Sequence, residues 1–241
     1  MNQYVLTSAV VLTSPVFAGF DQILDGIRML ARKRSEETGE RVFQGQIATF
    51  FENIDHYGCW CNFGKDYHNG RGPVQDSIDS DCKVMVSAQR CAKWDSIQRG
   101  NECNPATIEY IPFNLFSSNV DIMDECIEQN LKHPENPECA ADACVIEGDF
   151  TLKYFGAFFS GLTFDVELQH DYHAGGTFDQ SVSCITGHDG AIGPKSCCGE
   201  LPTRFPFDTQ LGARQCCYNA TFSADTHECC DSEKIQQIGT C

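Results

Sequence analysis

The stretch of sequence that decides the fold reads YGCWCNFG at residues 57–64, GRGPVQD at residues 70–76 and IDSDC at residues 78–82. It contains three of the 16 cysteines in the chain, at Cys59, Cys61 and Cys82. Residues 76–95 carry Ile78, Cys82, Met85, Val86 and Ala92 at the spacing of one helix face. We therefore expect a cysteine-rich loop that leads into an amphipathic helix.

The other cysteines extend this frame over most of the chain. None of the 16 lies in the first 18 residues, and such density behind an N-terminal leader is typical of a disulfide framework. Neighbouring cysteines rarely bond to each other, so each adjacent pair should send bridges in two directions. These pairs are Cys197-Cys198, Cys216-Cys217 and Cys229-Cys230. A zinc site is the less favoured alternative, because no histidine stands at ligand spacing around them.

The N-terminal segment has the features of a secretory signal peptide. It has no charge up to Gly19, an apolar run at residues 5–12, and Ala18 preceded by Val16 at a suitable cleavage site. The usual basic residue near the start is missing. The apolar run is too short to span a bilayer, and no later segment approaches 20 apolar residues. We expect residues 1–18 to be removed and the protein to be secreted.

The charge of the chain excludes some partners. The formal net charge is −17, from 34 acidic and 17 basic residues. Nucleic-acid binding needs a basic face, so we expect no nucleic acid as a partner. Strong attraction to anionic membranes is disfavoured for the same reason. A calcium ion, a phospholipid surface or an extracellular protein remains open as a partner, and the oligomeric state is not predicted.

The distribution of cysteines predicts two units, because residues 59–144 hold eight and residues 184–241 hold the other eight. We expect a mainly α, disulfide-rich fold with a helical domain at 19–147, an aromatic connector at 148–183 and a loop-rich Cys-rich module at 184–241. Two further helices are predicted in the domain. One follows the apolar face of residues 20–31, and the other runs through residues 121–131 behind a cap at Ser118 or Asn119.

The loop and the helix that follows it resemble secreted phospholipase A2, in which a Y-G-C-Y-C-G-x-G-G loop leads through G-x-P-x-D to a C-C-x-x-H-D helix. The close match covers about 35 residues and a looser one about 90, and we expect the phospholipase A2-like domain at residues 19–147. The resemblance implies that backbone carbonyls at Trp60, Asn62 and Gly64 face one calcium ion. Asn62 replaces a glycine and Lys65 brings a positive charge, so we expect calcium binding to be weakened.

The residues that perform hydrolysis in that family are replaced. The family uses a histidine as general base and the next residue, an aspartate, to bind calcium. Counting from Asp79 places this pair at Met85-Val86, and counting from Cys82 places it at Val86-Ser87. Neither register supplies a base or a carboxylate, so no catalytic residue is assigned here.

Other histidines offer an alternative to the missing pair. A displaced dyad at His170-Asp171 is the enzymatic alternative, although an exposed loop pair is the favoured interpretation of that dipeptide. His56 and His68 flank the loop and are expected in solvent.

The expected function is therefore a secreted phospholipase A2-like protein, non-catalytic or weakly active, that binds phospholipid, calcium or protein. One alternative is an active calcium-dependent phospholipase A2 with a displaced dyad. Another is a lipid-surface reader that uses the apolar residues 20–27 and the aromatic residues 155–164. A structural matrix or coat protein is the third alternative. Asn219 starts an N-glycosylation sequon, which would place its loop on the surface.

Overall fold

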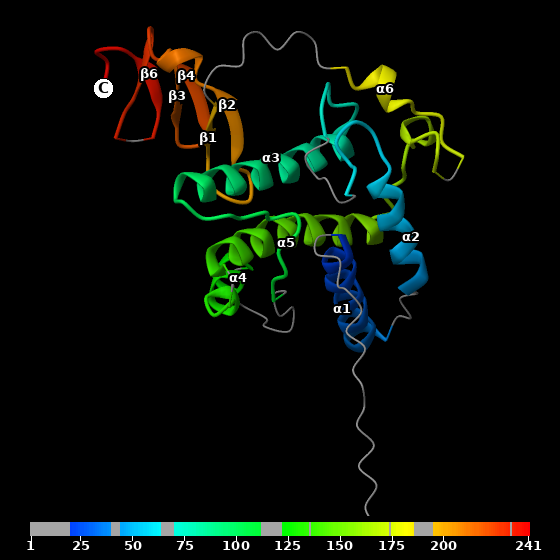
Figure 1. Cartoon of the computed structure of the whole chain (residues 1–241). Helices are drawn as coiled ribbons and strands as arrows, with labels where there is room; N and C mark the ends of the chain where they lie inside the picture. Colours follow the sequence, from blue (N-terminus) through cyan, green and yellow to red (C-terminus); the bar gives the residue numbers. More distant parts are fainter. Residues whose placement is uncertain are drawn as a thin grey trace, which may run out of the picture.

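The structure is a computed structural model that describes residues 20–39, 44–63, 70–111, 122–134, 136–173, 175–185, 195–231 and 233–241. Helices form its first three quarters (Figure 1): α1 (Phe20–Thr38), α2 (Gln44–Asp55), α3 (Ser77–Gln98), α4 (Ile122–Asn130), α5 (Pro137–Phe159), a 3-10 turn η2 (Val166–Leu168) and the short α6 (Gln180–Ser183). The fold is thus largely helical, as the sequence predicts.

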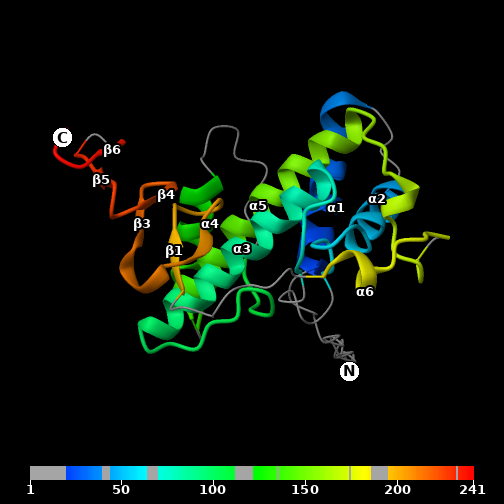
Figure 2. The ribbon, with the colours of Figure 1, turned by 90° about the horizontal axis from the view of Figure 1, so that it is seen from above.

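The C-terminal part consists of three two-stranded antiparallel hairpins. They pair β1 (Lys195–Cys198) with β2 (Phe205–Asp208), β3 (Arg214–Cys217) with β4 (Ala220–Ser223), and β5 (His227–Cys229) with β6 (Ile235–Gln237), with a 3-10 turn η3 (Gln210–Gly212) between the first two. Seen from above, the hairpins lie at one end of α3, and α2 and α6 lie at the other (Figure 2).

The two long helices α3 and α5 run antiparallel through the middle of the helical body. Asp81 meets Lys153 at one end of the pair, and Arg99 meets Glu138 at the other. Capping fixes where the helices begin. The Asp76 side chain accepts a hydrogen bond from the Asp79 amide at the start of α3. At the start of α5 the Asn136 side chain accepts from the Cys139 amide, and Pro137 follows this cap.

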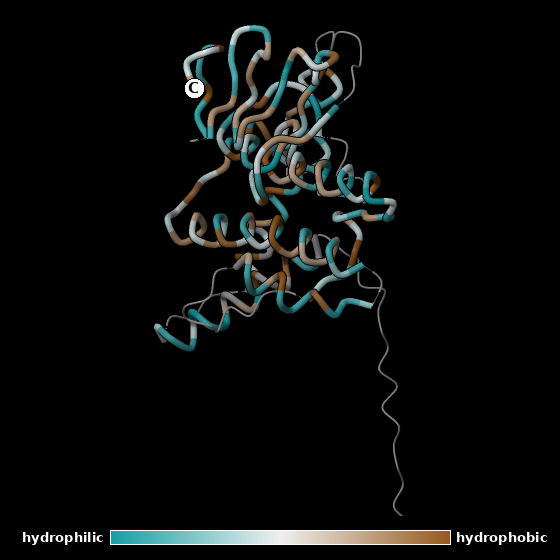
Figure 3. The backbone as a smooth tube through the Cα atoms, turned by 90° about the vertical axis from the view of Figure 1, so that its left-hand side faces the viewer, coloured by the Kyte–Doolittle hydropathy of each residue, from teal (hydrophilic) through white to brown (hydrophobic). Residues whose placement is uncertain are grey.

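The main hydrophobic core fills the space between α1, α2, α3 and α5. Its fully buried members include Ile27, Phe51, Val86 and Ile146, one from each helix. A second, smaller cluster lies between α4 and α5 around the Cys126–Cys144 disulfide. In Figure 3 hydrophobic residues recur along the helices, whereas the hairpins near the C-terminus mix hydrophobic and hydrophilic stretches.

All 16 cysteines form disulfides, and the adjacent pairs bridge outwards as predicted. Successive side chains of a strand point to opposite faces, so two neighbouring cysteines cannot reach the same partner region. Along the hairpins, the bridges Cys198–Cys216, Cys217–Cys229 and Cys230–Cys241 link one hairpin to the next and then to the chain end. The bridges Cys59–Cys184 and Cys91–Cys197 join the helical body to the later part of the chain.

The three helices expected from periodicity are confirmed as α1, α3 and α4, whereas α2 and α5 were not expected as such. The helix α5 continues across residue 147, so the expected connector at 148–183 begins inside it. The proposed signal segment 1–18, the caps Ser118 and Asn119, and His68 lie outside the described residues. No described helix is both long enough and apolar enough to cross a membrane.

Candidate functional site

The loop at residues 57–61 is fixed to the first turn of α3 by two carboxylates. Asp79 accepts hydrogen bonds from the backbone amides of Trp60 (2.6 Å) and Gln75 (2.9 Å), one on each oxygen. Asp76 accepts from the Tyr57 hydroxyl (2.6 Å) and from the Asp79 amide (2.9 Å). One oxygen of each carboxylate thus holds the loop, and the other fixes the backbone at the start of the helix.

Close packing under this loop explains one of its glycines. Gly58 has a positive φ of 59°, and a Cβ atom there would lie 2.6 Å from Cγ of Asp79. The disulfide Cys61–Cys82 closes the same junction covalently. Burial raises the pKa of Asp79, while the backbone amides that donate hydrogen bonds to its carboxylate oppose this shift. The junction is therefore a rigid structural unit.

Of the three expected calcium-loop positions, Trp60 and Asn62 are described, and Gly64 lies outside the described residues. The Trp60 carbonyl accepts a hydrogen bond from the Asn62 amide (3.1 Å), so one of its lone pairs is already engaged within the loop. Within the ranges that the structure covers, no three His, Cys, Asp or Glu side chains are grouped to hold a metal ion.

The positions expected for a catalytic pair are buried in α3. Met85 and Val86 are 2% and 0% exposed, and Ser87 is also buried. Met85 lines a cavity of about 150 Å³ together with Ile146 and Phe150 of α5. This volume is smaller than the roughly 300–1,000 Å³ of sites for drug-sized ligands. Met85, Val86 and Ile146 belong to the main core, so buried side chains pack between α3 and α5 at this level.

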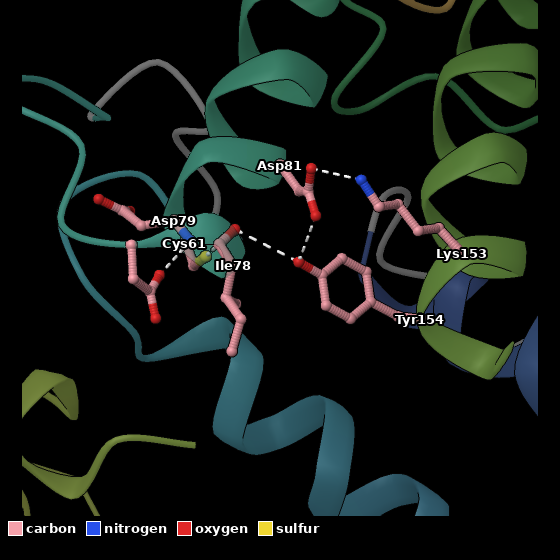
Figure 4. A network of polar contacts seen from close by, with 7 residues as sticks. Cys61, Ile78, Asp79, Asp81, Lys153 and Tyr154 are labelled. Carbon is pink, nitrogen blue, oxygen red and sulfur yellow. Dashed lines mark hydrogen bonds and ion pairs between the residues drawn. The ribbon is translucent and has the colours of Figure 1, made fainter. Parts of the chain in front are cut away.

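A polar network beside this cavity ties α5 to the start of α3 (Figure 4). The Tyr154 hydroxyl lies 3.0 Å from a carboxylate oxygen of Asp81 and 3.3 Å from the Ile78 carbonyl, and Lys153 forms an ion pair with Asp81. The donors Tyr154 and Lys153 of α5 thus face acceptor oxygens of α3, and the network braces the two helices.

The sequence analysis missed a buried carboxyl at Glu147. It has no exposed surface, and it accepts hydrogen bonds from the Tyr110 hydroxyl (2.6 Å) and from Nε2 of Gln89 (3.2 Å). Burial raises its pKa to about 8, against the lowering effect of these two donors. A glutamate that directly follows the apolar residues 143–146 was the available signal. The carboxyl is enclosed by protein and braces α3, α5 and the segment of Tyr110.

The expectation that His170 lies in an exposed loop is wrong. Its side chain is fully buried, because residues 169–173 and 175–178 fold back over the loop at residues 57–61. His170 Nε2 donates to the Gly58 carbonyl (2.8 Å), since a carbonyl can only accept. Nδ1 then accepts from the Tyr172 hydroxyl at 2.7 Å. Both ring nitrogens are engaged in hydrogen bonds, which leaves no free nitrogen to act as a general base. Asp171 is exposed.

His170 belongs to a histidine cluster, defined here as His56, His170 and His173. The ring of His56 lies 4.3 Å from that of His173 and 6.1 Å from that of His170, between centroids. His56, which was expected in solvent, is only partly exposed. Burial lowers the pKa of all three, and their mutual repulsion adds to this for His170 and His173. The cluster joins the end of α2 to the segment after η2.

The segments considered as a lipid-reading surface face inward. In α1, Ile23 and Ile27 are buried in the main core. Phe158 and Phe164 are partly buried and pack with their rings around Phe50 of α2. These residues thus serve the core of the helical body. Asn219 is exposed in the turn between β3 and β4, as its sequon predicts, and glycosylation stays a prediction.

Comparisons of this chain with family models, curated proteins and solved structures find no match.

Proposed function

We propose that this protein is a secreted, phospholipase A2-like protein that has lost the hydrolytic step and acts outside the cell by binding phospholipid, calcium or protein. The observation that carries the proposal is the burial of Met85 and Val86 in the core, with Ser87 next to them. Both registers of the resemblance place the catalytic pair on these residues, and none of them is a base at neutral pH.

The architecture around the loop supports the family resemblance. A cysteine loop is joined to the helix that follows it by Cys61–Cys82 and by the carboxylates of Asp76 and Asp79. An amphipathic helix, α1, precedes the loop, and a cysteine-bearing helix, α4, follows it. The eight disulfides support secretion, since disulfides form and persist mainly in oxidising compartments.

The contacts at the loop also bear on calcium. The Asp79 carboxylate accepts from the Trp60 amide and so holds the loop, and the position of the family's aspartate is Val86 or Ser87, neither of which carries a carboxylate. Calcium favours several oxygen ligands that include carboxylates. We therefore propose that any calcium bound by the loop carbonyls is held weakly, and we derive no chemical step through it.

The test is release of fatty acid from phosphatidylcholine vesicles by the oxidised protein in the presence of calcium. We expect release no faster than from vesicles alone, both for the wild-type chain and for a His170→Ala variant. Release that is lost with a chelator and lost again in His170→Ala would contradict the proposal and support the displaced dyad. Release that persists in His170→Ala would also contradict it and would point to a base elsewhere in the chain.

A further inference from the structure

A second site lies on a flank of α3, beside the core. It is a pocket of about 640 Å³ between α3, the segment at residues 70–73 and Pro206 of β2. From α3 it receives Lys83, Ser87 and Arg90. These residues are spaced by four and then three positions, which places them on one face of the helix. Because Cys82, Met85 and Val86 face the core, the pocket uses the neighbouring stripe of the same helix.

The indole of Trp60 forms a fixed wall of this pocket. Lys83 Nζ and Arg90 Cζ each lie 5.2 Å from the centre of a Trp60 ring, within the range of cation–π contacts. Gly70 packs on the same ring, where a Cβ atom would approach to 2.7 Å. Arg90 Nη2 donates to the Gly70 carbonyl at 2.6 Å, and Trp60 Nε1 donates to the Gly72 carbonyl at 3.2 Å. The wall is therefore held in place before any ligand arrives.

The charge of the pocket is opposite to that of the whole molecule. Its described lining contains three cations, Arg71, Lys83 and Arg90, and no acidic residue, in a chain of net charge −17. Contact with Trp60 and Gly70 gives Arg90 a structural role. Arg71 and Lys83 are exposed, and in the described parts of the chain neither forms an ion pair. Gathered positive charge in a concave site attracts anions.

From this arrangement we infer that the pocket binds a phosphate group carried on a small organic body. Lysine provides a mobile point charge and arginine a planar fork, and both are suited to phosphate oxygens. The apolar walls of Trp60, Ile185 and Pro206 suit the body of such a ligand, and the volume is typical of small-molecule sites. The inference rests on the proposed binding role and names its ligand class.

The test uses glycerol 3-phosphate as a soluble phosphate ester and glycerol as its uncharged counterpart. The chain has two tryptophans, so a Trp94→Phe background leaves Trp60 as the reporter of fluorescence. We expect a saturable change with glycerol 3-phosphate and none with glycerol. Lys83→Gln and Arg71→Gln should each weaken binding about tenfold, since each removes a charge-assisted hydrogen bond. Lys132→Gln, which removes an exposed lysine near α4, is the matched control and should bind like the parent.

A second experiment distinguishes a phosphate on a lipid headgroup from one on a soluble ester. Co-sedimentation with phosphatidylcholine vesicles that is reduced by Lys83→Gln identifies a lipid headgroup, whereas binding of glycerol 3-phosphate without co-sedimentation identifies a soluble ester. The inference is overturned if neither probe binds saturably, or if Lys132→Gln weakens binding as much as Lys83→Gln does. Fatty-acid release would contradict the non-hydrolytic role alone, so the two proposals fail separately.

Discussion

The helical body and the C-terminal hairpins are held together by different forces. In the body, four helices enclose a continuous core with fully buried Ile, Phe and Val side chains. In residues 195–241, the buried hydrophobic side chains of the described part are only Phe207, Phe222 and the half-cystines Cys198 and Cys217. Isolated two-stranded hairpins are marginal in water, so the bridges supply what a core would otherwise provide. Disulfides are thus reinforcement in one region and the main framework in the other.

The largest expected effect separates these two roles. Cys217→Ser/Cys229→Ser should abolish amide protection in β3–β6, because the hairpins have little else to hold them. Cys103→Ser/Cys139→Ser in the helical body should leave α3 and α5 protected, although its loop is longer, at 36 residues against 12. Chain entropy alone predicts the opposite order. Hydrogen exchange followed by mass spectrometry measures both variants, and equal loss of protection in the two regions would remove the distinction.

A smaller but still large effect is expected inside the body. Val86→Asp places an unpaired carboxylate in the core and should lower the free energy of unfolding by about 3–5 kcal/mol. Val84→Asp lies on the same helix at 38% exposure, and its effect should stay within about 0.5 kcal/mol. Denaturant titration compares the two. Similar midpoints would mean that the face of α3 at Val86 is open to solvent and not filled.

The buried Glu147 predicts that stability depends on pH between about 4.5 and about 8. Its pKa is raised from 4.5 to about 8 in the folded protein, so the folded state keeps a proton that the unfolded state loses. Stability should therefore fall as pH rises from about 4.5 to about 8, by about 1.4 kcal/mol for each pKa unit. Glu147→Gln should remove most of this slope and raise the melting temperature at pH 8. Glu128→Gln, an exposed site on α4, should keep the slope of the parent.

The smallest effect concerns the histidine cluster on the acid side. The pKa values of His56, His170 and His173 are lowered in the folded state, so the unfolded chain takes up protons first as pH falls below 6.5. Stability present above pH 6.5 should be lost below it. His173→Gln should reduce this loss of stability at acid pH, whereas His227→Gln in β5 should not. The comparison is made in a Glu147→Gln background, because Glu147 changes stability in the opposite direction over the same pH range. A melting temperature that is flat between pH 7 and pH 5 in that background would rule out the cluster as the origin of acid sensitivity.

Periodicity in the sequence predicted the helices that have one buried and one solvent-exposed face. In α1 and α3, apolar residues recur on one side, and both helices were found. The sequence of α5 is apolar on most sides around Ala143, Ile146 and Phe150, so it shows little period, and an aromatic connector was expected over its second half. A helix buried between neighbours loses the pattern on which such predictions depend.

The candidate sites divide in the same way. The replacement of the catalytic pair that the resemblance implies can be found from the sequence, because it follows from counting along one helix. The phosphate pocket is not, because Arg71 and Lys83 come from separate segments and meet only after the loop has folded against α3. Net charge averages over the surface and hides a local reversal of sign. The burial of His170 likewise depends on a backbone bridge between residues more than 100 positions apart.

The two bridges that join the body to the later chain also set an order of events during synthesis. Cys59 and Cys184 are 125 positions apart, and Cys91 and Cys197 are 106 apart, whereas Cys61 has its partner 21 residues away. At about 5–20 residues per second, the ribosome needs roughly 6–25 s to deliver Cys184 after Cys59. During this interval Cys59 is exposed to incorrect thiol partners, and any incorrect bridge must be resolved by disulfide exchange after Cys184 has emerged.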